Sequence, residues 1–247
     1  MYTNKQYWTD YYSGSEYTKE KIISICSQYD RFWDILIKSC QTDPKTILEI
    51  GAYPGRYISY FAWKYNIYPT AVDYNPDKET IKKSFVLMNI NNYEIISEDF
   101  IKWNSGNKYD LIISIGFIEH FEDYNTILDK HVYLLNEGGA LFISIPNKRG
   151  LRRLYGLICD RENLKRHNLK CMDTNIFKQF ALRNNLKINY LKYYGGFQHS
   201  VHQKLNIFQL IIYRIVRYFS LRFKIYIEEN PSWIYSAGII GIFSKVK

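Results

Sequence analysis

The chain has few cysteines, and their spacing builds no recognisable framework. The four of them, Cys26, Cys40, Cys159 and Cys171, lie far apart and include no Cys-x-x-Cys pair. This spacing argues against both a disulfide-stapled secreted scaffold and a cysteine zinc site. We therefore expect reduced thiols and a cytoplasmic location.

Long hydrophobic runs are also missing. No apolar stretch reaches the roughly 20 residues that a membrane-spanning helix needs, and the first residues, MYTNKQYWTDYYSGSEYTKE, contain no apolar segment typical of a secretory leader. The chain also has no internal repeat, low-complexity tract or linker. We therefore expect one domain over residues 1–247.

Basic and aromatic residues, in contrast, are abundant. The chain carries 33 Lys and Arg against 24 Asp and Glu, a net charge of +9, together with 24 tyrosines. A basic chain raises the hypothesis of a nucleic-acid partner, but the lysines are scattered and no DNA- or RNA-binding motif accompanies them. Since Lys, Asn, Ile and Tyr are enriched together, we attribute the charge to compositional bias and expect no nucleic acid partner.

Short apolar runs alternate with helical patterns in the first 147 residues. An amphipathic helix over 16–40 comes first, and the expected strands are TILEI, YPTAVD, EIISEDF, KYDLIISIGF and ALFISIP. Pro76 is expected in the first turn of one intervening helix, and the glycines of TILDKHVYLLNEGG are expected to end another. This alternation predicts a doubly wound, Rossmann-like α/β sheet whose strands are mostly parallel.

The C-terminal part has a different pattern. NIFKQFALRNNL reads as a helix, KINYLKYY as a strand, NIFQLIIYRIVRYFSLRF as a broadly apolar helix and WIYSAGIIGIFSKVK as a last strand. A late strand, an inserted helix and a final strand predict an antiparallel edge pair. We therefore expect a seven-stranded sheet with an antiparallel C-terminal edge strand and an inserted cap helix.

The stretch ILEIGAYPGRYISYFA turns sharply from the first expected strand into a helix. Gly51 can adopt backbone angles closed to other residues, and Gly55 lets the helix start close to the strand. Asp73 ends the second strand about 20 residues later, where a carboxylate can bind ribose hydroxyls. The dinucleotide fingerprint G-x-G-x-x-G fails, because Tyr53 and Arg56 occupy its second and third glycine positions. A nucleoside-containing ligand other than a dinucleotide is indicated.

These residues resemble class I S-adenosylmethionine-dependent methyltransferases of the small-molecule type. EIGAYPG resembles the family's E/D-x-G-x-G-x-G motif, AVDYNP its ribose-binding acid, SEDF its adenine-reading pair, SIGFIEHFED the segment at the methionine end and LLNEGGALFISIPN the fifth-strand segment. The resemblance implies S-adenosyl-L-methionine as cofactor and S-adenosyl-L-homocysteine as product. It divides the chain into an N-terminal lid and helix (1–42), a cofactor-binding core (45–147) and a substrate-side part with edge strands and cap insert (148–247).

The resemblance also implies a set of cofactor-binding residues. They are Tyr12, Glu49, Gly51, Ala52, Tyr53, Gly55, Asp73, Tyr74, Asp99, Phe100, Gly116 and Phe117. Tyr12 or Tyr17 belongs here because WTDYYSGSEY resembles the aromatic lid of relatives, with ordinary aromatic packing as the alternative.

Methyl transfer to a hydroxyl needs a group that accepts a proton. Glu119 and His120 directly follow the fourth strand, and His167 follows the fifth, so we name these three as candidate catalytic residues, with loop packing as the alternative. His199 and His202 flank the inserted helix and are candidate substrate contacts. A metal site of Glu119, His120 and Glu122 with a distant histidine is not expected, because adjacent loop residues seldom reach one ion together.

The absence of one loop motif narrows the class of methyl acceptor. Amino-methyltransferases of bases and glutamine carry an (N/D)-P-P-(Y/F) loop after the fourth strand, which this chain lacks. Small-molecule O-methylation remains, and the chain resembles bacterial enzymes that methylate sugars or phosphoramidate-type precursors of surface (capsular) polysaccharide. The alternatives are a lipid or quinone methyltransferase with a peripheral membrane contact, and a non-catalytic S-adenosylmethionine-binding protein. Both a monomer and a homodimer fit the sequence.

Overall fold

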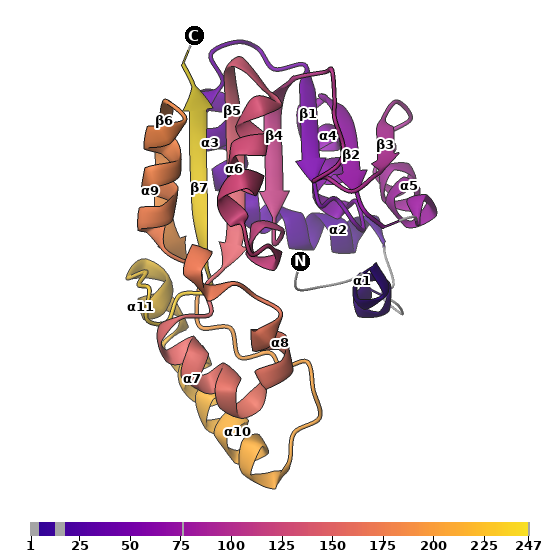
Figure 1. Cartoon of the computed structure of the whole chain (residues 1–247). Coiled ribbons are helices and arrows are strands. Elements are labelled where there is room, and N and C mark those ends of the chain that lie inside the picture. Colours follow the sequence, from indigo (N-terminus) through magenta and orange to yellow (C-terminus); the bar gives the residue numbers. More distant parts are fainter. Residues whose placement is uncertain (1–4, 13–17, 76, 247) are drawn as a thin grey trace.

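The computed structural model describes residues 5–12, 18–75 and 77–246, and these build one seven-stranded sheet in the order β3-β2-β1-β4-β5-β7-β6 (Figure 1). The strands are β1 (Thr46–Ile50), β2 (Tyr68–Asp73), β3 (Glu94–Ser97), β4 (Tyr109–Ile115), β5 (Leu135–Pro146), β6 (Leu186–Tyr194) and β7 (Gly238–Lys245). Strands β1 to β5 pair in parallel, and β7 runs antiparallel to both β5 and β6. The predicted doubly wound, mostly parallel fold is confirmed.

The antiparallel pair differs in one detail from a simple edge strand. The C-terminal strand β7 inserts between β5 and β6, so β6 forms the edge of the sheet. On the other side, strand order reverses between β1 and β4, which are hydrogen-bonded neighbours. In sheets of this kind ligands bind at such a reversal, beyond the carboxyl ends of the strands.

Helices cover both faces of the sheet. The helices of the first face are α2 (Lys19–Cys26), α3 (Asp30–Ser39), α4 (Arg56–Tyr65) and α5 (Lys78–Leu87), and those of the second are α6 (Tyr124–Tyr133) and α9 (Thr174–Arg183). Along β4 the side chains alternate, with Leu111 and Ile113 in the first core and Ile112 in the second. Trp33 of α3 is fully buried, its ring 4.6 Å from that of Phe142 in β5. This alternation is the signature of a strand buried on both faces.

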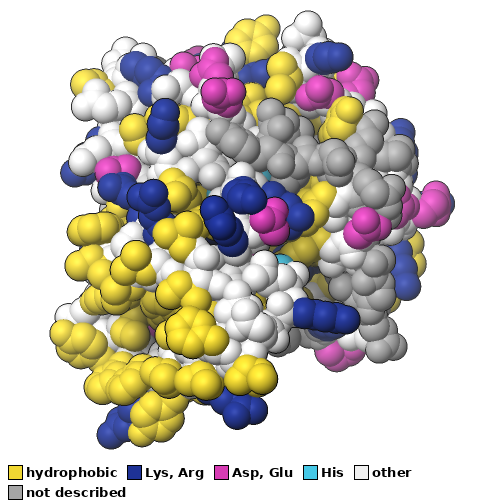
Figure 2. Space-filling view, turned by 60° about the horizontal axis from the view of Figure 1, so that its bottom comes forward, with side chains coloured by type: hydrophobic (Ala, Val, Ile, Leu, Met, Phe, Trp, Pro, Cys, Tyr) yellow, Lys and Arg dark blue, Asp and Glu magenta, His cyan; other side chains and the backbone are white. Residues whose placement is uncertain are grey.

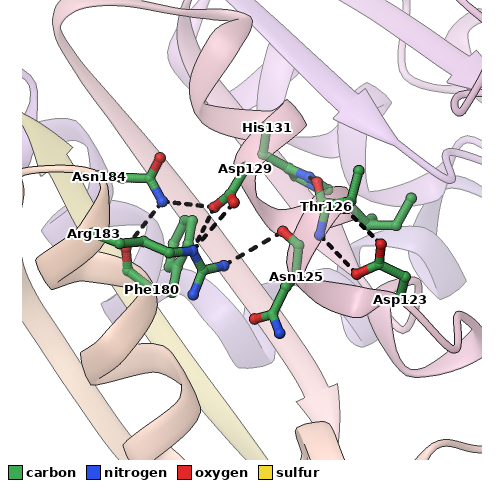
Figure 3. Close-up of polar contacts among 9 residues, drawn as sticks. Asp123, Asn125, Thr126, Asp129, His131, Phe180, Arg183 and Asn184 are labelled. Carbon is green, nitrogen blue, oxygen red and sulfur yellow. Dashed lines mark hydrogen bonds and ion pairs between the residues drawn. The ribbon is translucent and has the colours of Figure 1, made fainter.

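Polar contacts join the two helices of the second face (Figure 3). Asp129 of α6 accepts hydrogen bonds from Nε of Arg183 at 2.9 Å and from Nδ2 of Asn184 at 2.7 Å. Asp123 caps the start of α6 by accepting the N–H of Thr126 at 3.2 Å. These contacts hold α6 and α9 side by side.

The remaining helices lie beyond the carboxyl ends of the parallel strands, where Figure 1 shows α7, α8 and α10 together. They are α7 (Gly150–Cys159), α8 (Arg161–Lys165), α10 (Ile207–Arg222) and α11 (Lys224–Glu229), with α1 (Lys5–Tyr12) near the same edge. Asn206 and Gln209 form a capping box at the start of α10, and Gln209 Nε2 donates to the Ile158 carbonyl of α7 at 2.7 Å. The predicted inserted helix is thus present and docked on α7.

Several expected boundaries are wrong. The helix predicted over 16–40 is two helices, because the chain bends through a 3₁₀ turn at Ser27–Tyr29 and the Trp33 indole N–H occupies the Cys26 carbonyl. Helix α5 starts at Lys78 on an Asp77 cap, and Pro76 lies outside the described residues.

Two further boundaries differ near the strands. Helix α6 ends at Tyr133, and the glycines predicted to end it belong to β5, at a register irregularity against β4. The last strand begins at Gly238, because the preceding segment turns back on itself and Asn147 Nδ2 binds its Trp233 and Ser236 carbonyls at 3.0 and 3.1 Å.

Candidate active site

A cavity of about 1170 Å³ opens at the carboxyl edge of the sheet. Its walls include Tyr12, Glu49, Gly51, Tyr53, Asp73, Tyr74, Gly116, Phe117, Glu119, His120, His167, His199 and His202. The structure therefore brings most of the predicted site residues to one place, although they come from segments that are far apart in the sequence. Ala52, Gly55, Asp99 and Phe100 do not line it, and Tyr17 lies outside the described residues.

The turn after β1 depends on glycine geometry. Gly51 has φ +73, and a Cβ there would lie 2.5 Å from the Phe117 ring, which follows β4. Gly55 has φ +91 and precedes the first residue of α4. Other residues rarely adopt such angles, so these two glycines allow the chain to turn tightly beside the cavity.

Two carboxylates hold this turn in place, that of the buried Glu49 and that of the partly buried Asp73. Oε2 of Glu49 accepts the N–H of Ile58 in α4 at 2.9 Å. Asp73 accepts the N–H of Tyr53 at 2.9 Å and that of Asn75 at 2.7 Å. Burial raises the pKa of both carboxyls, well above the ordinary value for Glu49, while the backbone hydrogen bonds act in the opposite direction.

The segment after β3 packs against a residue that lines the cavity. Asp99 accepts the N–H of Ile101 at 3.0 Å within its own turn. Phe100 is buried in the core, and its ring centroid lies 5.7 Å from that of the wall residue Phe117. Its contact with the cavity is therefore indirect in this structure.

Helix α1 brings aromatic rings to the mouth of the cavity. Tyr12 lies 5.6 Å from Tyr53, Trp8 5.1 Å from His120 and Tyr11 5.8 Å from His202, measured between ring centroids. The predicted N-terminal lid therefore contacts both the turn after β1 and the histidines.

The three candidate catalytic residues form one cluster. A carboxylate oxygen of Glu119 and a ring nitrogen from each of His120 and His167 lie within 4.8 Å of one another. Burial raises the pKa of Glu119 to about 8 and lowers those of His120 and His167 to about 4 and about 2. Both imidazoles are therefore neutral at pH 7.

Hydrogen bonds of Asn168 hold the neighbouring residue His167 beside Glu119 and His120. Its N–H donates to the Glu119 carbonyl at 2.7 Å, and its side-chain amide donates to the carbonyls of Phe121 and Glu122 at 3.0 and 3.2 Å. The loop after α8 is thus tied to the loop after β4. Nothing in the sequence pattern indicated this clamp, because the two segments are joined only in three dimensions.

The two remaining candidate histidines, His199 and His202, also line the cavity. His202 donates its N–H to Asp160 at 3.1 Å, and its Nδ1 lies 3.0 Å from the other oxygen of that carboxylate. Nδ1 of His199 lies 3.0 Å from the Ser220 hydroxyl of α10. Sequence reasoning missed Asp160, which ends α7 and gives no motif signal.

Lys148 and Arg152 are further cavity residues that the sequence did not indicate. Nη1 of Arg152 donates to the carbonyls of Asn147 and Ala237 at 2.9 and 2.7 Å. Burial lowers the pKa of Lys148 to about 8 and that of Arg152 to about 10. The cavity therefore places two cations close to its acidic and imidazole groups.

Taken together, the glycine turn, Asp73 and the carboxyl-edge cavity are the features of a doubly wound protein with a ligand site at the reversal of strand order. A family model described as a methyltransferase domain matches residues 20–199, and the chain belongs to this family.

The chain is also similar in sequence to individual curated proteins. Over 103 residues the chain is 28% identical to a probable (S)-tetrahydroprotoberberine N-methyltransferase 2 of Papaver bracteatum, a match covering 41% of this chain and 29% of that protein. The chain thus aligns with less than a third of that curated relative.

Solved structures share the whole fold. The N-methyltransferase NodS of Bradyrhizobium japonicum WM9, in complex with S-adenosyl-L-homocysteine, superposes with a TM-score of 0.59 at 12% identity, covering 98% of both chains. A putative sarcosine dimethylglycine methyltransferase of Galdieria sulphuraria gives 0.61 at 16% identity, again over 98% of both chains. The family match confirms the predicted class of a methyltransferase domain, and the shared fold of a structure that holds S-adenosyl-L-homocysteine is consistent with the predicted cofactor.

Proposed function

We propose that this chain transfers the methyl group of S-adenosylmethionine to a hydroxyl of a small molecule. The observation that carries the proposal is that the glycine turn and the Glu119–His120–His167 cluster line one cavity. Its volume of about 1170 Å³ has room for a cofactor and a small acceptor together. A sugar or phosphoramidate-type precursor of surface polysaccharide is the acceptor class that the sequence resemblance favours.

The chain's own residues fit the cofactor. A Cβ at Gly51 would lie 2.5 Å from the Phe117 ring, so glycine at this position allows the turn and Phe117 to line the cavity together. Asp73 at the end of β2 would bind the ribose hydroxyls, and the ring of Tyr12, 5.6 Å from that of Tyr53, would lie beside the bound cofactor. The bound cofactor supplies an electrophilic methyl group on a sulfonium.

The reaction also requires that the acceptor hydroxyl be aligned with the methyl group and that its proton be removed. The acceptor oxygen must lie in line with the methyl carbon and the sulfur, and holding that geometry removes much of the barrier. When bound, the cofactor would supply its methyl group to the acceptor oxygen, and Glu119, His120 and His167 would take up the proton that leaves the hydroxyl. We therefore expect the reacting hydroxyl to lie against this cluster.

The first test addresses the cofactor. In isothermal titration with S-adenosylhomocysteine, Asp73→Ala should weaken binding at least tenfold, about 1.4 kcal/mol. Asp77→Asn is the matched control, because Asn also caps helices well and Asp77 caps α5 beside the same turn. Unchanged affinity of the Asp73 variant would remove the assigned ribose contact.

The second test addresses the acceptor atom. The protein is incubated with cofactor and a panel of small alcohols, sugars and amines, and the methylated products are located by mass spectrometry and NMR. O-methyl products are expected, and they should fall sharply with Glu119→Gln. Products methylated only on nitrogen would replace the hydroxyl proposal with the amine chemistry named for the similar plant and bacterial proteins.

A specific surface feature favours a second candidate, a methyltransferase whose acceptor lies in a lipid surface. Helix α10 exposes large hydrophobic side chains, among them Phe208 at 67%, Ile211 at 52% and Ile215 at 52%. Figure 2 shows hydrophobic side chains gathered on this face with Lys and Arg at its border. None of the helices in the described ranges is long and apolar enough to cross a membrane, so such contact would be peripheral.

Vesicle flotation tests this second candidate. Anionic phosphatidylglycerol vesicles should carry the wild-type protein, whereas Ile211→Glu with Ile215→Glu should leave it in the soluble fraction. Leu182→Glu is the control, because Leu182 is 74% exposed on α9 and not on this face. If the wild type does not float, the lipid candidate is wrong.

A further inference from the structure

The cluster of Glu119, His120 and His167 has the composition of a metal site. The side chains of Glu119 and His120 are 1% and 3% exposed, and each of the three offers one ligand atom within 4.8 Å of the others. Ligand atoms bound to one zinc-sized ion lie about 3–4 Å apart. Small rotations of these side chains would therefore close the site around an ion.

Hydrogen bonds on the far side of both imidazoles orient them. Nδ1 of His120 lies 2.9 Å from the Arg166 carbonyl, and Nδ1 of His167 lies 2.7 Å from the Asn163 carbonyl. Carbonyl oxygens only accept, so each Nδ1 carries the proton and each Nε2 carries a free lone pair. Metal-binding histidines are typically held in this way.

Glu119 supplies an independent observation. Its Oε2 atom is buried and has no hydrogen-bond partner among the described residues, and Oε1 lies 3.8 Å from Nε2 of His120. A buried carboxylate oxygen without a partner is costly. Lys148 is the neighbouring cation that could offset this charge, although no hydrogen bond joins it to Glu119 in the structure.

We propose that Glu119, His120 and His167 bind one divalent transition-metal ion of the Zn²⁺ or Co²⁺ type. Two imidazoles and one carboxylate are a ligand set that such ions use in catalytic sites, whereas Mg²⁺ prefers oxygen ligands and water. The sequence-based expectation of no metal considered Glu122, but that residue is exposed and contributes only its carbonyl, to Asn168.

The ion would face the methyl acceptor. All three ligands line the cavity, so a coordination position remains open towards it. Resting on the proposed function, an acceptor hydroxyl at that position would have a lowered pKa, because a bound cation stabilises the alkoxide. Since the three ligand atoms would then be occupied by the ion, the hydroxyl proton would pass to water in the open cavity instead of to the cluster. The site itself does not depend on that reaction.

The test uses Co²⁺ as a visible probe on the full chain, followed by competition with Zn²⁺. Wild type should bind one Co²⁺ with the absorption bands of an ordered four- or five-coordinate ion, and Zn²⁺ should displace it while Mg²⁺ does not. Glu119→Gln and His167→Asn should each weaken Co²⁺ binding at least tenfold. His199→Asn, which removes a cavity histidine outside the cluster, should leave it unchanged.

The outcomes are separable. Absence of stoichiometric Co²⁺ binding to wild type, or equal binding to all variants, would overturn the proposal and leave Lys148 as the partner of Glu119. Thermal unfolding and S-adenosylhomocysteine titration of each variant check folding independently of metal. Should Glu119→Gln not fold, His167→Asn decides, because His167 is only partly buried in its loop.

Discussion

Gly55 is the residue on which the tight start of α4 depends. Its φ is +91, and a Cβ would lie 3.0 Å from Cγ2 of Ile81 and 3.1 Å from that residue's Cα and carbonyl oxygen in α5. Backbone atoms cannot move aside as a flexible side chain can. Both the strained angle and the contact therefore oppose any larger residue here.

We expect Gly55→Ala to lower the free energy of unfolding by about 1–3 kcal/mol and to weaken S-adenosylhomocysteine binding, because α4 must shift away from the turn. Denaturant titration and calorimetry measure the two effects. Gly106→Ala is the matched control, since nothing lies within 4 Å of its Cβ position. Equal stability of the two variants would contradict this account.

His131 illustrates how a buried side chain makes stability depend on pH. It lies in α6 with Nδ1 2.7 Å from the Ile127 carbonyl, and its ring centroid is 5.2 Å from that of Phe100. Burial lowers its pKa from 6.5 to about 4. His131 is therefore a structural residue of the core.

The direction in which stability changes with pH follows from proton binding at His131. Between pH 6.5 and about 4 the unfolded chain binds a proton at His131 that the folded chain does not, so acid favours unfolding. The contribution present above pH 6.5 should fall by about 3 kcal/mol as the pH reaches 4. Denaturant titrations across this range should show a shallower pH slope for His131→Leu than for wild type. Parallel slopes would show that His131 does not carry the effect.

At the scale of elements, α1 is the piece whose role can be separated from folding. Its rings contact Tyr53 and the histidines, yet within the described ranges none of its residues belongs to either hydrophobic core. We therefore expect α1 to act as the predicted lid, adding contacts to a bound ligand without contributing to the core.

Removal of residues 1–12 should therefore weaken S-adenosylhomocysteine binding about tenfold, about 1.4 kcal/mol, with little change in the midpoint of thermal unfolding. Titration calorimetry and circular dichroism measure these separately. A large drop in the unfolding midpoint would show instead that α1 is part of the folded core.

Helices and strands whose ends are marked by nearby residues in the sequence were predictable. Strand β2 matches its predicted range because a buried apolar run defines it. Helix α4 begins directly after Gly55, as predicted, and Asn66 follows its last residue. The break inside 16–40 was not predictable in this way. It arises where Trp33 packs on Phe142 and binds the Cys26 carbonyl, contacts that bring together separate parts of the chain.

At the scale of the whole molecule, the role of the exposed apolar surface of α10 could likewise not be predicted from the sequence. Periodicity correctly indicated a broadly apolar helix, since its residues are adjacent in sequence. Which side of that helix packs on α7 and which faces outward depends on the docking seen in Figure 1. A single sequence pattern is compatible with a cap, a dimer contact or a lipid contact.

The sequence by itself determined the sheet, the turn after β1 and the cofactor class, because Gly51, Gly55 and Asp73 act through local backbone geometry and short spacing. It also placed Glu119 and His120 at the correct edge. Only the tertiary structure decided that His167 joins them, through the clamp made by Asn168. A contact between distant segments depends on how the intervening helices pack, and that packing is not written in any local pattern.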